Sequence, residues 1–287
     1  MKRKILEDVL SQSPSDSLYH YTQQRGFMGI VQSAEIWATH TQYLNDRREY
    51  LHAVDMVRDQ IQIKAMRAFG DPNLRSILQD MENGLDGIEG MNVCVCSFSE
   101  ERDSLSQWRA YGGGSSGFSI GFSGDFLTEV AGQEGWYLAP CIYDPKAQSD
   151  LVSALVQEVI EENVARESAE TKEEVMLPLG GNLNAYLHRY APILKDYSFR
   201  EEREWRLISR PLSCTFDAFD FREGSSMLTP YYRLRLGADP TALNIQEVVV
   251  GPTPHPDQSS RSTRSFLVRH SLKTVPVVAS QVPYRSW

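Results

Sequence analysis

One short segment, residues 200–206, concentrates the side chains most able to do chemistry. Its sequence, Arg-Glu-Glu-Arg-Glu-Trp-Arg, holds three carboxylates and three guanidinium groups, and it runs into an apolar stretch typical of a strand. Solvated charge clusters usually occur in helical or disordered surface segments. Because this cluster contains Trp205 and ends in a strand, we expect its carboxylates, Glu202 and Glu204, to be held at a strand edge or in a cleft.

A second candidate lies far upstream, where His20 is part of the aromatic sequence Leu-Tyr-His-Tyr-Thr of residues 18–22. A histidine in an apolar strand is more often a hydrogen-bonded core residue than a catalytic one, and a single Glu204 is more often one half of a surface ion pair. The six histidines are scattered, and none forms a pair at metal-ligand spacing. The Gly-rich stretch 112–117 lacks the Lys-Ser/Thr of a phosphate-binding P-loop and is a weak candidate.

The composition limits the classes of partner. The chain has 287 residues, 41% of them hydrophobic, which is enough for one large domain or two small ones. The net charge of −9 disfavours non-specific binding to nucleic acid but leaves room for a local basic cleft. We expect Cys94 and Cys96 to be buried, reduced thiols, as in cytoplasmic proteins. No secretory signal and no membrane-length apolar run is visible in the sequence, so we expect a cytoplasmic protein without a membrane partner.

Short apolar segments interrupted by blocks of helix predict an α+β fold. We expect a short helix and linker over residues 1–16, then one domain over residues 17–287 that carries a helical insertion at 147–195. The predicted strands cover residues 18–22, 35–39, 92–97, 118–122, 136–143, 204–209, 231–236, 245–251 and 274–280. Because strands and helices do not alternate regularly, the sheet should be mostly antiparallel and split or mixed, not parallel and doubly wound.

A long helix is predicted over residues 47–68. Asp46 would cap its first turn, with Glu49 as the capping-box partner. Apolar residues recur at helical spacing and predict one buried stripe, formed by Leu51, Val54, Val57, Ile61 and Ala65. We therefore expect this helix to be structural.

The motifs also follow one another in the order of a known family. The order comprises His-Tyr-Thr at 20–22, Trp-Ala-Thr at 37–39, Leu-Asn-Asp at 44–46 with Glu49, Cys-Ser-Phe-Ser-Glu at 96–100, Ser-Leu-Ser-Gln-Trp-Arg-Ala-Tyr-Gly at 104–112, Gly-Phe-Ser-Ile-Gly-Phe at 117–122, and Glu-Arg-Glu-Trp-Arg-Leu at 202–207. It resembles the bacterial family known as domain of unknown function 2971 (DUF2971). That family is remotely similar to the ADP-ribosyltransferases, including DNA-modifying toxins of the DarT kind, which implies an ADP-ribosyltransferase-like fold.

The remote resemblance implies an enzyme that uses NAD as a substrate, with no metal. His20 would hydrogen-bond the ribose or the adenylate side of NAD, and Tyr111 or Tyr21 would stack on nicotinamide. Glu204 would hydrogen-bond the ribose 2′-hydroxyl and stabilise the oxocarbenium-like cation that forms as the nicotinamide–ribose bond breaks. Glu202, on the same strand face, would orient the incoming nucleophile. We therefore expect His20, Tyr111 and Glu204 to converge in one cleft.

The resemblance also implies further contacts and a biological role. Arg109 or Arg206 would bind the pyrophosphate with bidentate geometry. The other NAD-binding residues would be Tyr21, Thr22, Asn45, Asp46 and Trp108. The implied function is ADP-ribosyl transfer to a protein or nucleic acid by a bacterial toxin or anti-phage defence effector, whose partners could include an antitoxin. The chain departs from the best-known patterns because no Ser-Thr-Ser triplet precedes the glutamate. An NAD glycohydrolase with the same site, or a catalytically inactive module that binds a nucleotide or protein, is the alternative.

Overall fold

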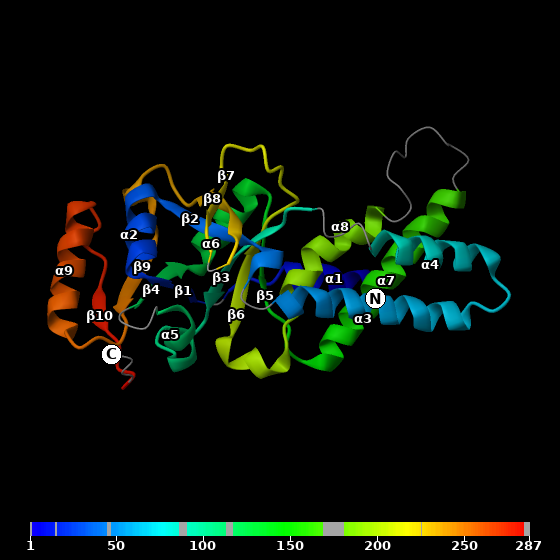
Figure 1. Ribbon diagram of the computed structural model, residues 1–287, viewed down its shortest axis with the longest axis horizontal. Helices are drawn as coiled ribbons and strands as arrows, with labels where there is room; N and C mark the ends of the chain where they lie inside the picture. The colour runs from blue at the N-terminus through cyan, green and yellow to red at the C-terminus, as the bar shows by residue number, and fades with distance from the viewer. Residues whose placement is uncertain are drawn as a thin grey trace.

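A mostly antiparallel sheet with helices on its faces and at its ends makes up the fold (Figure 1). The computed structural model describes residues 2–14, 16–44, 47–85, 91–112, 117–168, 181–224 and 226–283. The strands are β1 (Ser17–Gln23), β2 (Glu35–His40), β3 (Cys94–Ser99), β4 (Gly117–Ser123), β5 (Tyr137–Pro140), β6 (Glu204–Ile208), β7 (Phe219–Glu223), β8 (Leu228–Arg235), β9 (Ile245–Val250) and β10 (Val277–Ala279). The α-helices are α1 (Lys2–Leu10), α2 (Gln24–Ser33), α3 (Arg47–Arg67), α4 (Pro72–Gly84), α5 (Leu105–Tyr111), α6 (Gly124–Glu134), α7 (Pro145–Ser168), α8 (Gly181–Tyr190) and α9 (Pro256–Arg269). Short 3-10 helices include η1 (Thr41–Tyr43), η3 (Ala191–Ile193), η4 (Tyr197–Glu202) and η5 (Pro240–Ala242).

The sheet forks at β3, because β1 and β2 pair with different parts of this strand. Its strands follow the order β10-β9-β4-β1-β3-β2-β8-β7, with β6 on the other edge of β3 and β5 beyond β6. Along one edge, β1 pairs with the end of β3 at Ser99, and β2 pairs with its beginning at Cys94 and Val95. All of these pairs are antiparallel except β9 with β10. The predicted α+β class with a mostly antiparallel sheet is confirmed.

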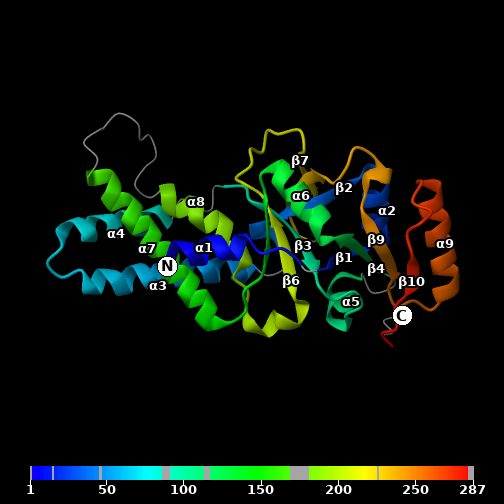
Figure 2. The same cartoon turned by 180° about the vertical axis from the view of Figure 1, so that it is seen from behind.

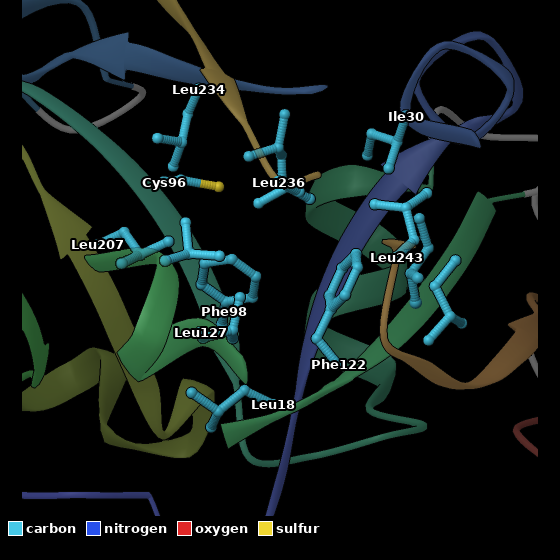
Figure 3. Close-up of a cluster of buried hydrophobic side chains, with 14 of the residues drawn as sticks. Leu18, Ile30, Cys96, Phe98, Phe122, Leu127, Leu207, Leu234, Leu236 and Leu243 are labelled. Carbon is cyan, nitrogen blue, oxygen red and sulfur yellow. The ribbon is translucent and has the colours of Figure 1, made fainter. Parts of the chain in front are cut away.

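Apolar side chains on both faces of the sheet form two cores. Alternation along β3 points Cys96 and Phe98 into the first core and Val95 into the second. Figure 3 shows the first core, where Leu127 of α6 and Ile30 of α2 meet the strand residues. A polar side chain that is buried on these strands must therefore find partners inside the protein.

The second core belongs to a lobe of helices at one end of the sheet, made by α1, α3, α4, α7 and α8 (Figure 1). The described part of the range predicted as a helical insertion, 147–195, contains most of α7 together with α8 and η3. The N-terminal helix, expected as a separate element, packs on α7, and the Tyr190 hydroxyl donates a hydrogen bond to the carbonyl of Leu6 at 3.1 Å. None of the described helices is long and apolar enough to cross a membrane.

The long helix predicted over 47–68 is α3, and its buried stripe differs in part from the prediction. Val54, Val57 and Ile61 are buried as expected, whereas Leu51 and Ala65 are exposed. Ala53 is buried on the helix as well, and Ala68, just after its end, is also buried. The predicted cap Asp46 lies outside the described residues.

The four cysteines are free thiols; Cys94, Cys96 and Cys141 are buried and Cys214 is exposed. Burial raises the pKa of the Cys94 thiol to about 12, and only thiolates react readily. We therefore expect a thiol reagent at neutral pH to count one thiol in the folded protein and four after denaturation without reductant. A count of two or none in the denatured protein would contradict the free-thiol assignment.

Candidate active site

Glu204 is the first residue of β6, and its buried carboxylate is held by two cations. Arg206 donates from Nε to Oε1 at 2.7 Å and from Nη2 to Oε2 at 3.1 Å, while the Lys195 ammonium pairs with Oε2. The backbone explains the placement: Arg203 has a left-handed φ of 43°, which ends η4 and lets the chain enter the strand. The guanidinium and ammonium thus lie in the interior with a carboxylate between them.

Lys195 also binds a second carboxylate, that of Glu202. Its Nζ also bonds Oε2 of Glu202 at 2.5 Å, and it lies 5.2 Å from the centre of the Phe199 ring. Glu202 is the last residue of η4 and not a strand neighbour of Glu204 as expected; the two carboxylates meet through Lys195. We call Lys195, Glu202, Glu204 and Arg206 the Glu204 cluster, which holds two positive and two negative side chains.

The cations keep Glu204 ionised despite its burial. Burial alone would raise the pKa of this carboxyl, but the charges and hydrogen bonds of Arg206 and Lys195 outweigh it and lower the pKa to about 2. The same charges affect Tyr111, at the end of α5. Its pKa is raised to about 12, mainly by burial and then by the negative charges of Glu204 and Glu202. Tyr111 is therefore a protonated phenol within the electrostatic influence of Glu204, and its helix α5 contacts η4.

The strand register separates His20 from this cluster. Ser99 pairs with Tyr19 of β1 and with Glu204 of β6, and paired residues of antiparallel strands project from the same face. His20, the next residue of β1, projects from the opposite face. Its ring lies 5.7 Å from that of Phe98, a residue of the first core. The expected convergence of His20, Tyr111 and Glu204 is thus corrected, because alternation along β1 turns His20 away.

His20 instead fills the fork of the sheet. Its Nδ1 lies 3.0 Å from the Ser97 carbonyl, where β1 diverges from β3, and 3.8 Å from Sγ of Cys96. Burial lowers the pKa of His20, so the ring is neutral at pH 7. A neutral, hydrogen-bonded imidazole at this point has a structural role in the fork.

We expect His20→Ala to lower the free energy of unfolding by about 1–3 kcal/mol. The Ser97 carbonyl loses this hydrogen bond, and a void opens beside Phe98. Urea unfolding measures the loss, and any NAD cleavage per folded molecule should remain unchanged. A hundredfold loss of cleavage at wild-type stability would instead return His20 to the active site.

The aromatic residues predicted to contact NAD are packed against one another. Tyr21 and Trp108 meet edge to face with ring centres 4.7 Å apart. The Tyr21 hydroxyl donates to the Glu101 carbonyl at 2.6 Å and accepts from the Ser104 amide at 3.0 Å. Trp108 is fully buried. Tyr111 packs against the group that contains both residues, which leaves it as the predicted aromatic whose pKa responds to the charges of the Glu204 cluster.

The remaining predicted residues are spread out. Thr22 lies on the His20 face of β1, where its side chain approaches Gly26 of α2. Arg109 is exposed on α5, whereas Arg206 is buried in the cluster. Asn45 and Asp46 lie outside the described residues. Among the residues that the structure describes, no group of three His, Cys, Asp or Glu side chains could hold a metal ion.

Lys195 is the functional candidate that the sequence did not reveal. It stands alone in the sequence Leu-Lys-Asp-Tyr, nine positions before Glu204, and no spacing rule links the two. The isolated bridge between Ile142 and Leu194 brings this segment beside β5 and β6. Gln148 reinforces it by donating to the Lys195 carbonyl at 2.7 Å.

Comparison with known proteins places the cluster inside a recognised sequence family. The model of the family described as "Protein of unknown function (DUF2971)" matches residues 107–207, a range that includes Tyr111 and the whole Glu204 cluster but not His20. No curated protein and no solved structure matches the chain. Over residues 107–207 the match confirms the resemblance to DUF2971 that the sequence motifs carry.

Proposed function

We propose that this protein cleaves the nicotinamide–ribose bond of NAD at the Glu204 cluster and transfers ADP-ribose to a macromolecular acceptor. One observation carries the proposal: Glu204 is a buried carboxylate that two cations keep ionised, with its pKa lowered to about 2. Buried acids with strongly shifted pKa values are concentrated at functional sites. The role of toxin or defence effector rests on the family resemblance.

The chemistry suits such a carboxylate. Departure of nicotinamide leaves positive charge on C1′ and the ring oxygen of the ribose, and a preorganised negative group stabilises that charge without reorganising. Tyr111, whose pKa is raised in part by the charges of Glu204 and Glu202, would supply the ring that stacks on nicotinamide. Glu202, held by the same ammonium, is placed to orient an incoming hydroxyl or amide. His20 has no part in this version of the site.

An ADP-ribosyltransferase-like fold belongs to the same proposal. Its support is the forked, mostly antiparallel sheet, with Glu204 on the strand that pairs with β3 opposite the fork. The face that carries Glu204 also carries Tyr19 and Tyr21 of β1, so aromatic and acidic side chains share one side of the sheet.

A second candidate, a binding module without catalysis, is favoured by one specific feature. Lys195 and Arg206 already balance the charges of Glu202 and Glu204. A neutralised carboxylate stabilises a nearby cation less than a free one. In this account the cluster holds η4 and β6 together, and the same face binds a nucleotide or a protein without cleaving anything.

Nicotinamide release separates the two candidates. Purified protein is incubated with NAD labelled in the nicotinamide ring, with and without a bacterial lysate as acceptor source. A Lys146→Ala variant, which loses only an exposed ion pair with Asp150, serves as a matched control. The proposal predicts equal release by both proteins. Free ADP-ribose as the other product would identify a glycohydrolase, and no release under any condition would favour the binding module.

A further inference from the structure

The helix α5 is too short to hold its own position. It has seven residues, and isolated helices of that length are unstable in water. Its Trp108 is the anchor: the indole packs in a space where a Cβ atom on Gly251 would come within 2.9 Å of the ring. Contacts from outside the helix must therefore set where α5 lies and where its last residue, Tyr111, points.

Asp103, just before α5, gathers three of these contacts. Its Oδ1 accepts from Nε1 of Trp108 at 2.6 Å and from the Ser280 hydroxyl at 2.6 Å, and its Oδ2 accepts from the Gln281 amide at 2.8 Å. Ser280 in turn accepts from the amide of Val282 at 3.1 Å. One carboxylate thus joins the anchor of α5 to the C-terminal segment, 177 positions away in the sequence.

The same segment adds apolar contacts. Val278 and Val282 pack against the group formed by Tyr21, Trp108 and Val249, and Tyr111 packs against that group as well. Figure 2 shows β10 and the C-terminus at the same end of the molecule as α5. Asp103 and the C-terminal segment lie outside the residues that match the family, so this arrangement is additional to what the match covers.

We propose that residues 278–282 form a clasp that holds α5 through Asp103, which makes Asp103 a positioning residue for Tyr111. The clasp itself follows from the contacts alone. Its consequence for NAD binding rests on the proposed function, in which Tyr111 stacks on nicotinamide. Opening the clasp would let α5 move and would weaken NAD binding without touching Glu204.

Hydrogen exchange of the full-length protein tests the clasp without reference to activity. In Asp103→Asn, the side-chain NH₂ group that replaces Oδ2 cannot accept the hydrogen bond from the Gln281 amide. In Ser280→Ala, the hydrogen bond from the Ser280 hydroxyl to Asp103 is lost. Each should speed exchange of the α5 amides, such as that of Gly112, by about tenfold or more. Asp150→Asn and Ser262→Ala, which alter exposed hydrogen bonds elsewhere, are the matched controls and should leave α5 unchanged.

The kinetic arm measures KM and kcat for nicotinamide release in the same variants. We expect KM for NAD to rise roughly threefold or more with kcat little changed, because binding and not bond breaking depends on Tyr111. Unchanged exchange of α5 in both variants would overturn the clasp. Faster exchange with unchanged KM would overturn the positioning of Tyr111. Faster exchange in a protein that releases no nicotinamide would support the clasp while the proposed function fails.

Discussion

Glu204→Gln is expected to lower the free energy of unfolding by about 3–5 kcal/mol. The substitution removes the negative charge between Lys195 and Arg206, so both cations stay buried with less compensation. A buried ion pair that loses one partner costs far more than a surface pair. Urea unfolding of the wild type and the variant measures the difference.

The matched control is Glu101→Gln. Glu101 also pairs with an arginine, Arg203, but both side chains are exposed, so the loss should be at most about 1 kcal/mol. Equal effects of the two substitutions would contradict the buried-network account of Glu204.

The same ion pairs determine how the free energy of unfolding changes with pH. The pKa of Glu204 is about 2 in the folded protein, against 4.5 for its ordinary value. A depressed pKa contributes stability that is present above pH 4.5 and is lost as the pH falls toward 2, on the order of 3 kcal/mol in all. Glu204→Gln should flatten this part of the stability curve.

The second large effect concerns catalysis. Glu204→Gln should cut NAD cleavage by roughly a hundredfold or more, an effect of about 3 kcal/mol on the transition state. The loss should fall on kcat with KM little changed, since ground-state contacts are mostly retained. If Glu202 orients the nucleophile, as proposed, Glu202→Gln should reduce transfer to the acceptor more than cleavage to water. Equal losses of both reactions in Glu202→Gln would contradict that role.

Local sequence patterns predicted much of the fold because the strands near the cluster have strong local signals. The strands expected over 118–122 and 204–209 are β4, which alternates apolar with small residues, and β6, which ends in apolar residues. The edge strand β7 was missed, since its sequence Phe-Asp-Phe-Arg-Glu is mostly exposed and looks like a polar loop. The strand expected over 274–280 is present as the shorter β10 (Val277–Ala279), which pairs with β9.

The candidate site was predicted only in part, because it depends on distant pairings. The charge density around Glu204 was visible in the sequence. The face on which His20 lies depends on the pairing of Tyr19 with Ser99, and a slip of one residue would reverse it. No local pattern encodes that register. Lys195 was invisible for a similar reason: its proximity to Glu204 comes from how the insertion returns to the sheet.

The most direct test of the central claim compares nicotinamide release by the wild type and Glu204→Gln at a temperature below both melting transitions. Rates are normalised to the folded fraction, so the expected loss of stability cannot imitate a loss of catalysis. Lys146→Ala again serves as the control. The account predicts measurable release by the wild type and the control, and release about a hundredfold slower by Glu204→Gln. Wild-type turnover by folded Glu204→Gln would contradict the claim that this carboxylate cleaves NAD.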